Sequence, residues 1–538
     1  MYAYLLEVEA YVGEQDPWIM SSGVWDDNAV WDDEGVWLDE PEANPGVETL
    51  YLATHTIATR PTETPANKLY DGRIVETGNF SRSLISQGRL GRASDSWGYI
   101  ELANTDGGLD SWLDYGFDGR PFIIKSLPVQ GMPVTQATTL FRGTIAALES
   151  GNAADTLRLR IRDRLAELQV PLLTVRYAGT SVSTGLGVEG DADLQDQLKP
   201  RVFGAAPNVQ PKLVNKYDLL YQVSVGMVSL ITVYDGAAPL TNIGDYPVLS
   251  SMMAATVAPG EYVTCYALGI FRLGGTPVFV ITADVVEDAD DLSAAAVAGR
   301  ILDLLDISAD DRDQDSFDTL AASSPAQVGL FVDAETNALE LITQVLGSSA
   351  AIIPNTEGIF QVVGLAEPVA ANTAGELTFR DLAEGGSFSF GVGPDDAGVP
   401  AWSVVLNWGR VWQTMTEGQI AGVVDLARRT YLASQWRQAT SEDASIKTKH
   451  LLASQITADT LLTLQADAQA EAARILGLYS SRRDMLSFPT DSDRAPYDLG
   501  EVVTVTLPRF GYDDGRPMLV VGKHIDADKA VTTLDLWG

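Results

Sequence analysis

The first 173 residues alternate between apolar and polar positions in short runs, a pattern that predicts β-strands. Residues 156–165 are the clearest case, because Leu157, Leu159 and Ile161 alternate with arginines, as in a strand with one buried and one exposed face. Two further runs, 120–127 and 138–148, are rich in β-branched and aromatic residues and lie between turn-forming residues. We therefore expect residues 1–173 to form a β-barrel domain.

A second β-rich module is expected over residues 174–290, after a bridge rich in Gly and Asp. Its two longest apolar runs are 219–241 and 261–285, and Gly274-Gly275 within the second run is typical of a hairpin turn. The sequence therefore predicts strands throughout this module.

The spacing of apolar residues changes from strand-like to helix-like after residue 290, and this change predicts a small α/β domain over residues 291–400. Ser293 is placed to cap a helix that carries Ile301, Leu302 and Leu305 on one face. A second helix is expected to end before Gly347, and residues 350–365 read as two strands around a turn.

The remaining residues, 401–538, combine a long helix with a return to strands. The helix is predicted over 457–480 from one apolar stripe, made of Leu461, Leu464, Ala468, Ala472, Ile475 and Tyr479. Strand patterns with two intervening turns then predict a three-stranded meander over 499–538, and we expect the C-terminus to be tucked into the fold.

Length and charge narrow the possible functions. A chain of 538 residues suggests roughly three or four domains of about 100–200 residues each. The formal charge of −37 repels phosphate backbones and anionic lipid. The N-terminus lacks the basic region of a secretory signal and no apolar run is long enough to cross a bilayer, so neither export by a signal nor a transmembrane segment is expected.

The residue types that usually carry catalysis or bind metals are scarce. The three histidines, His55, His450 and His524, lie far apart without partners at metal-site spacing, and we expect them to be ordinary surface or strand residues. Cys265 lies in an apolar run and is expected to be buried, although a Cys–His hydrolase is formally possible. Nucleophile-elbow, P-loop and dinucleotide-binding patterns do not occur. The expectation is no enzyme activity, no cofactor and no metal.

One acidic turn superficially resembles a calcium loop. Counted from Asn104, with Asp106 and Asp110 as further oxygen donors, position five is Gly108 and position twelve is Tyr115. An EF-hand loop needs oxygen-donating side chains at positions five and twelve, and a glutamate at twelve. Neither is present, so we interpret the segment as a glycine turn between strands.

Four segments, in order along the chain, resemble the tail-tip or baseplate hub family of long-tailed, siphovirus-like phages and gene-transfer particles. They are residues 78–127, residues 159–173 followed by 199–224, residues 323–368 and residues 493–538. The resemblance implies a homotrimer in which each chain contributes two tail-tube-like β-barrels plus small α/β domains, a contractile-tail-hub-like architecture. The second barrel would then include strands around Trp402 to Met415 and over 500–538.

The resemblance also implies a function. Such a hub is a structural virion protein at the phage tail tip, assembled in the host cytoplasm, that closes the distal end of the tail tube and opens for DNA ejection. Its partners would be the distal tail protein or tail tube, the tape-measure protein and receptor-binding or fibre proteins. Specific nucleic-acid binding is not expected, although DNA would pass through the lumen. A receptor- or glycan-binding tail protein and a polysaccharide depolymerase are the alternatives.

A tryptophan repeat distinguishes this chain from the proteins it resembles, in which the first strand runs almost directly into the next. Trp25, Trp31 and Trp37 recur every six residues within an insertion at about 13–46. Acidic residues fill the spacing: Asp26, Asp27, Asp32, Asp33 and Glu34. Three interpretations stay open, namely a self-packed loop with tryptophans as its core, a contact with a neighbouring tail protein, or a calcium site.

Overall fold

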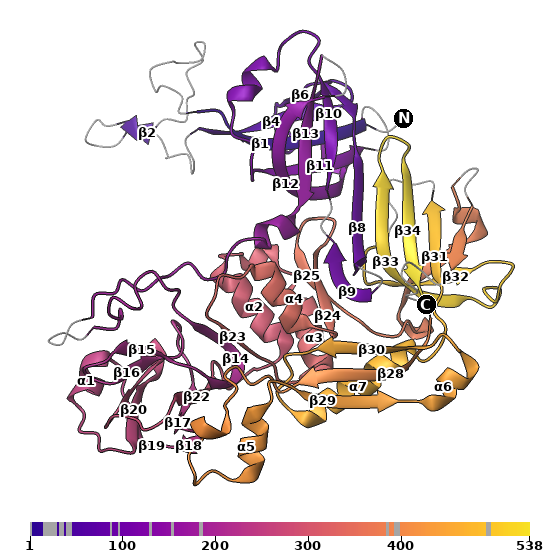
Figure 1. Ribbon diagram of the computed structural model, residues 1–538. Helices are drawn as coiled ribbons and strands as arrows, with labels where there is room; N and C mark the ends of the chain where they lie inside the picture. The colour runs from indigo at the N-terminus through magenta and orange to yellow at the C-terminus, as the bar shows by residue number, and fades with distance from the viewer. Residues whose placement is uncertain are drawn as a thin grey trace.

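The chain is mainly β, as the sequence predicts, with a few helices between the sheets. The computed structural model describes residues 3–13, 30–31, 37–38, 46–86, 89–94, 97–127, 132–151, 155–181, 187–383, 387–391, 399–490 and 497–538. Figure 1 shows the N-terminal sheet at the top, the C-terminal sheet beside it, a β-rich module at the lower left, and helices with a small sheet between these parts.

The N-terminal sheet has seven antiparallel strands. In sheet order they are β4 (Val47–Ala53), β1 (Ala3–Tyr11), β11 (Pro121–Leu127), β12 (Thr138–Ser150), β13 (Thr156–Asp163), β10 (Trp97–Ala103) and β7 (Ile74–Glu76). Leu157, Leu159 and Ile161 of β13 are buried in its core, which confirms the alternation in the sequence.

A short segment, residues 71–76, bonds to the edge strand β4 and, near the other side of the sheet, to β10. The Ala53 amide of β4 donates to the Asp71 carbonyl at 2.7 Å, and the Ala103 amide of β10 donates to the Arg73 carbonyl at 2.7 Å. The sheet therefore curls until residues 71–76 link its first strand to its last. Two short ladders lie apart from it: β2 (Val30–Trp31) with β3 (Trp37–Leu38), and β5 (Ile57–Ala58) with β6 (Leu69–Tyr70).

The middle module contains two five-stranded sheets. One has the order β18 (Ala238–Pro239), β17 (Leu230–Asp235), β22 (Ile281–Val286), β14 (Arg201–Val209) and β23 (Gly329–Val332). The other has the order β15 (Lys212–Asn215), β16 (Leu220–Gln222), β21 (Ile270–Leu273), β20 (Glu261–Cys265) and β19 (Thr241–Asp245), and α1 (Leu249–Ala254) packs on β20.

The expectation of a hairpin at Gly274-Gly275 is wrong. These glycines join β21 of one sheet to β22 of the other, and the two strands do not pair. A Cβ on Gly274 would lie 2.1 Å from the carbonyl oxygen of Ala258. A close approach between two backbone segments therefore accounts for the glycine, and this signal is indistinguishable from a turn in the sequence.

The α/β elements are α2 (Ala294–Leu304), α3 (Gln314–Ser323), α4 (Ala338–Leu346), β24 (Ala350–Pro354) and β25 (Phe360–Gly364). Ser293 caps α2 by accepting from the Ala296 amide at 3.3 Å, Gly347 ends α4 with a φ of 56°, and β24 pairs antiparallel with β25. These three expectations are confirmed.

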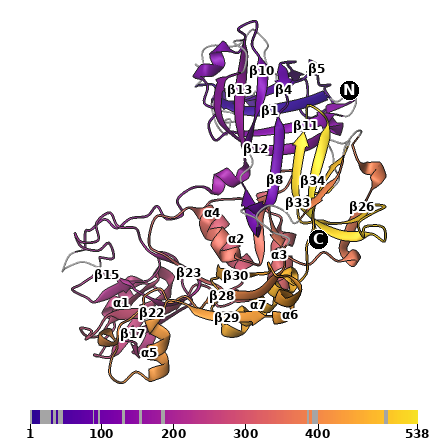
Figure 2. The ribbon, with the colours of Figure 1, turned by 45° about the vertical axis from the view of Figure 1, so that its right-hand side comes forward.

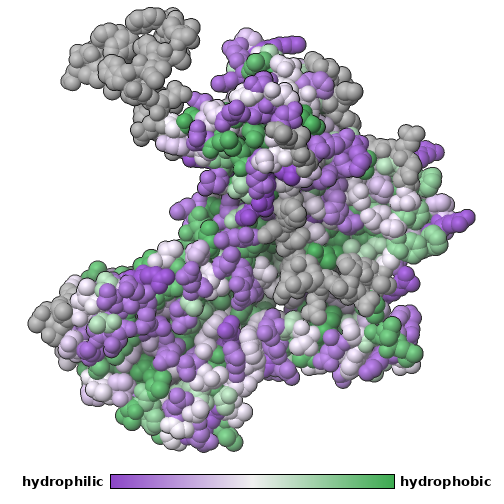
Figure 3. All heavy atoms as spheres, turned by 45° about the horizontal axis from the view of Figure 1, so that its top comes forward, coloured by the Kyte–Doolittle hydropathy of each residue, from purple (hydrophilic) through white to green (hydrophobic). Residues whose placement is uncertain are grey.

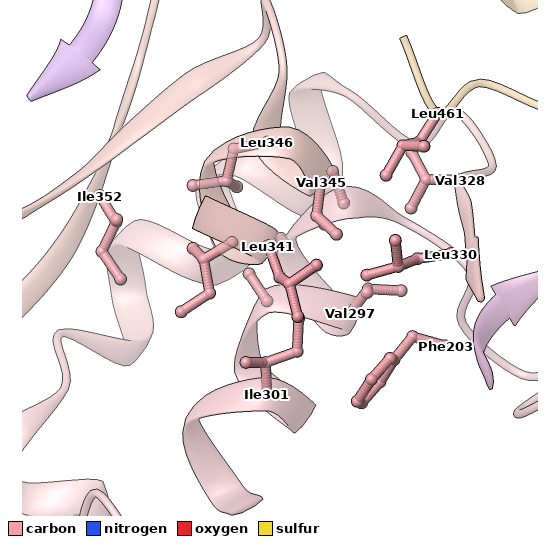
Figure 4. Close-up of a cluster of buried hydrophobic side chains, with 14 of the residues drawn as sticks. Phe203, Val297, Ile301, Val328, Leu330, Leu341, Val345, Leu346, Ile352 and Leu461 are labelled. Carbon is pink, nitrogen blue, oxygen red and sulfur yellow. The ribbon is translucent and has the colours of Figure 1, made fainter. Parts of the chain in front are cut away.

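The core under these helices extends beyond the expected domain boundary at residue 290. Figure 4 shows Val297 and Ile301 of α2 and Leu341 of α4 facing Phe203 of β14 and Leu330 of β23. β23 itself pairs with β14 in the middle module. The core under the α/β helices therefore includes residues of β14 and β23 from the middle module, which also has a separate core of its own.

A three-stranded sheet follows, made of β29 (Arg437–Glu442), β28 (Ala401–Trp408) and β30 (Ser454–Asp459). α5 (Leu426–Ala433) and α6 (Ala444–Lys449) lie in its connections, and α7 (Gln465–Tyr479) packs on β28 and β29. The helix expected over 457–480 therefore begins later, because residues 454–459 pair in parallel with β28. That partner lies some fifty residues away, so local periodicity could not reveal it.

The C-terminal sheet has the order β26 (Thr373–Thr378), β32 (Val502–Thr506), β33 (Arg516–Asp526), β34 (Val531–Trp537), β31 (Met485–Thr490) and β27 (Ser389–Gly391). The expected meander of β32, β33 and β34 is confirmed. The strand at Trp402 to Met415, expected in the same barrel, is not in this sheet: its residues 401–408 form β28. Two strands from the first domain join instead, β8 (Asn79–Ser86) on β33 and β9 (Arg89–Ser94) on β8.

Candidate functional site

The junction between the N-terminal and C-terminal sheets holds two groups of hydrogen-bonded polar side chains, one on each face. β8 lies beside β33 in both ribbon views, and residues 79–83 pair antiparallel with 522–526. Segments more than 430 residues apart in sequence therefore share one ladder, and their side chains meet on its two faces.

Three side chains form a hydrogen-bonded row across this ladder. Ser81 Oγ lies 2.5 Å from His524 Nδ1, and His524 Nε2 lies 2.8 Å from Asp535 Oδ2. The three residues come from β8, β33 and β34. A serine, a histidine and an aspartate in contact are also the components of a hydrolase triad, so the row needs a chemical test.

The surroundings of Ser81 differ from those of a nucleophilic serine. Ser81 lies within the ladder, opposite His524 and between two other paired residues, Phe80 and Arg82. A nucleophile elbow instead exposes its serine on a strained turn, next to amides that stabilise an oxyanion. The row therefore acts as a cross-strand polar contact between β8, β33 and β34. His524 is the strand residue that the sequence predicts.

A groove of about 420 Å³ adjoins the row. Asp535 lines it together with Ser83 of β8 and Ser487 of β31. Its apolar walls are Ile85, Phe390, Met485, Leu486 and Val521. Phe390 also packs against Phe510, with ring centroids 4.9 Å apart.

A buried ion cluster fastens the opposite face of the junction. Arg82 of β8 is 5% exposed, and its guanidinium donates to Asp498 at 2.6 Å, to the Pro354 carbonyl at 3.0 Å and to Thr356 Oγ1 at 2.9 Å. Lys523 of β33, also buried, donates to the Tyr497 carbonyl at 3.0 Å. The cluster joins β8, the β24–β25 turn and the C-terminal sheet.

The charges in this cluster are mutually compensated. Burial by itself raises the pKa of Asp498, but Arg82 and Lys523 outweigh it and hold that pKa below its usual value. Burial lowers the pKa of Lys523, and Asp498 opposes the shift. Each charged group in the cluster is therefore stabilised by its oppositely charged neighbour. Removing one of them leaves the charge of its partner only partly balanced in a poorly solvated position.

A second polar assembly attaches the α5 region to the middle module. Arg428 lies over the ring of Tyr234 at 4.7 Å, and Arg437 lies over Tyr431 at 3.5 Å. Arg410 lies over Trp412 at 3.9 Å. Burial lowers the pKa of Arg410 and of Arg437. The aromatic rings offset part of the free-energy cost of removing these guanidinium groups from water. The contacts therefore hold α5 and its neighbouring residues against β17, although these segments are far apart in sequence.

The tryptophan repeat mostly lies outside the described residues. Trp25, Asp26, Asp27, Asp32 and Asp33 are not described, and the structure gives only the backbone of Trp31 and Trp37. That backbone places Trp31 opposite Trp37 in the β2–β3 ladder. The three interpretations of the repeat stay predictions.

The remaining candidates take structural positions. Cys265 is fully buried in β20, as expected, and burial raises the pKa of its thiol. Asn104 and Asp110 hydrogen-bond to each other at 2.7 Å in the acidic turn, and Arg73 pairs with Asp106 at 2.8 Å. Within the described ranges, no group of three or more His, Cys, Asp or Glu side chains is arranged to hold a metal ion, and no helix is long and apolar enough to cross a membrane.

Comparison with known proteins gives structural matches only. No family model and no curated protein matches the chain. A tail protein from Neisseria meningitidis is 10% identical over 86% of this chain and 91% of its own, with a TM-score of 0.37. The 43 kDa tail protein of prophage MuSo2 from Shewanella oneidensis is 9% identical over 87% and 93%, with a TM-score of 0.38.

A third match is a chain from the virion of a native gene transfer agent particle. It is 12% identical over 64% of this chain and 84% of its own, with a TM-score of 0.40.

Proposed function

We propose that the protein is a structural hub at the distal end of a phage-type tail tube, built as a ring of three copies. In this proposal the N-terminal and C-terminal sheets of each chain occupy two neighbouring positions in the wall of the ring. Three chains then offer six positions to a six-fold tube, and the interface between chains is heterologous around a closed ring.

The observation that carries the proposal is the pairing of β8 with β33. A ring wall requires its two β units at a fixed spacing, and a flexible linker would not provide this. Here, backbone pairing over residues 79–83 and 522–526 and the Arg82 ion cluster fix the C-terminal sheet against the N-terminal domain. Rigid side-by-side units of this kind suit a component that must match a preformed ring.

Charge and chemistry agree with a structural role. A surface of net charge −37 does not adsorb the DNA that passes a tail tube. The Ser81–His524–Asp535 row lies within a ladder rather than at an exposed turn. We therefore assign no reaction to it, and place the chain at the tail tip with the tube, the tape-measure protein and receptor-binding proteins as neighbours.

Two measurements test the proposal. Native mass spectrometry of the purified chain is expected to give a species of three times 57.7 kDa. Electron microscopy of particles that carry a labelled copy is expected to show three labels at the distal end of the tube. A monomer at every concentration and salt tested, together with label at the periphery of the tail, would rule out the hub.

A further inference from the structure

The groove beside the Ser81–His524–Asp535 row is more specific than the exposed apolar residues of this chain. Figure 3 shows apolar residues scattered singly and in small groups over a largely hydrophilic surface, which is normal for a folded protein. The groove instead brings side chains from five strands together around a volume of about 420 Å³. Ligand sites occupy about 300–1,000 Å³, and the groove falls in this range.

One row of directly opposed residues runs along the groove. Ser389 pairs with Ser487, Ser487 with Asp535, Asp535 with Gly522, and Gly522 with Ser83. Residues that lie opposite one another in paired strands project to the same face. Three serine hydroxyls therefore lie in line with one carboxylate, across β27, β31, β34, β33 and β8, and Figure 1 shows the last four of these strands side by side.

The glycine in this row leaves room for the carboxylate. A Cβ on Gly522 would lie 2.9 Å from Oδ2 of Asp535, so a larger residue would displace that carboxylate. A glycine inside a strand often marks a close approach of this kind. The side chain of Asp535 keeps 30% of its surface exposed.

The groove offers hydrogen-bond acceptors and one negative charge. Oδ2 of Asp535 contacts Nε2 of His524 at 2.8 Å, whereas Oδ1 and the hydroxyls of Ser389 and Ser487 have no hydrogen-bond partner in the described part of the chain. Among the described residues that line the groove, Asp535 alone is charged. His524 balances this charge only when its ring is protonated, and no lysine or arginine of the described ranges pairs with Asp535.

These features select a cationic group on an apolar stem. The guanidinium group of arginine carries only donors, which match the free carboxylate oxygen and the hydroxyls. Its methylene stem buries along apolar surface, and Ile85, Phe390 and Met485 provide that surface. An anionic ligand would instead meet the carboxylate of Asp535 without a cation from the groove wall.

A free sheet edge beside the groove indicates that the arginine belongs to an extended peptide. β27 ends the C-terminal sheet, and no strand of the described residues pairs with its outer edge. An edge strand offers backbone N–H and C=O groups to an added strand, and adjacent pockets then recognise alternate side chains of that strand. The net charge of −37 also attracts basic segments.

We propose that the groove binds an extended segment of a partner protein and places one arginine of that segment against Asp535. The guanidinium group donates to Oδ1 of Asp535 and to the hydroxyl of Ser487, and the apolar walls enclose the stem. The segment adds to the edge of β27. This inference goes beyond the proposed hub, because it needs neither the ring nor three copies of the chain.

The test uses a defined peptide and the purified full chain. The probe is a short peptide of alternating threonine and alanine with one central arginine. Its counterpart carries citrulline, which has the shape of arginine without the charge. Saturation-transfer NMR, which detects weak ligands, gives both affinities. The wild type is expected to bind the arginine peptide at least about tenfold more tightly, because the citrulline peptide lacks the charge-assisted hydrogen bond.

Three variants locate the binding. Asp535→Asn keeps an acceptor for His524 but removes the charge, and it is expected to bind the two peptides equally. Ser389→Trp fills the groove from an exposed position and is expected to weaken binding of both peptides by about tenfold or more. Asp114→Asn is the matched control, since it removes the same charge from an exposed position on the N-terminal domain, and it is expected to bind like the wild type. Circular dichroism and thermal unfolding check that each variant folds.

Each outcome decides the inference. If the wild type does not bind the arginine peptide, or if Asp535→Asn keeps the preference for arginine, Asp535 does not recognise a cation and the inference is wrong. A signal from methyl glucoside that Ser389→Trp abolishes, without a signal from the peptide, would make the groove a sugar site instead. None of these results bears on the trimer, which native mass spectrometry tests separately.

Discussion

Replacing Arg82 by methionine tests how the two large sheets are held together. The change removes four hydrogen bonds from a side chain that is 5% exposed: two to Asp498, at 2.6 and 3.3 Å, one to the Pro354 carbonyl and one to Thr356. Breaking a buried pair by removing one partner costs about 3–5 kcal/mol. Lys523 and the Thr356 donors still face Asp498, so we expect the lower end, about 3 kcal/mol.

Hydrogen exchange is the suitable assay, because a chain of several domains does not unfold in one transition. Peptides that cover 79–86 and 516–526 are expected to exchange about 150-fold faster in the variant if the junction opens locally, which is 3 kcal/mol expressed as an equilibrium constant. Peptides from β12 and β13 are expected to be unchanged.

The matched control is Arg160→Met. Arg160 also lies in a strand and pairs with Glu149, but the two side chains are 50% and 44% exposed. Exposed pairs contribute about 0–1 kcal/mol, so exchange is expected to change by less than about tenfold. If Arg82→Met behaves like this control, the ion cluster does not hold the sheets together.

The pH dependence follows from the lowered pKa of Asp498. The stability that its ionised form contributes is fully present above the ordinary carboxyl pKa of 3.8 and is lost as the pH falls through its lower folded value. Slowed exchange at the junction is therefore expected to persist from pH 8 to about pH 5 and to weaken below about pH 4. A loss of protection centred near pH 6 would contradict this assignment.

Four further predictions follow from particular contacts. Ser81→Ala is expected to leave labelling by a serine-reactive fluorophosphonate unchanged at background, whereas labelling of the wild type that Ser81→Ala abolishes would reveal a nucleophile. Ser293→Ala removes the α2 cap and is expected to cost about 1 kcal/mol in the calorimetric stability of the α/β elements. Leu341→Ala empties part of the core in Figure 4 and is expected to cost about 2–5 kcal/mol by the same measurement, whereas a cost below 1 would contradict its packing. Deleting residues 23–40 is expected to leave the chain folded and the proposed trimer intact in native mass spectra, and to weaken attachment to a partner in the tail. Normal infectious tails would contradict this prediction.

Local pattern was sufficient for much of the secondary structure. The alternation at 156–165, the cap at Ser293, the end of α4 at Gly347 and the C-terminal meander are all properties of a few consecutive residues, and the structure confirms each of them. Backbone hydrogen bonding and one-sided burial produce these patterns directly, so a short window contains the information.

Local pattern does not predict elements whose partners lie far away in the sequence. Residues 454–459 are a strand because β28 offers a parallel edge, and Gly274 is a glycine because the backbone near Ala258 passes close to it. The Ser81–His524–Asp535 row cannot be predicted from sequence spacing for the same reason, since Ser81 and His524 lie 443 positions apart. No spacing rule relates positions that only a shared ladder brings together.

The sequence by itself determined the mainly β composition, the acidic character, the burial of Cys265 and the resemblance to tail hub proteins, because these depend on residue type and on local period. Only the tertiary structure decided that strand β8 belongs with the C-terminal sheet and that the buried Arg82 pairs with Asp498. The physical reason is that strands far apart in sequence pair because their surfaces are buried and hydrogen-bonded together. No single segment of the sequence contains that information.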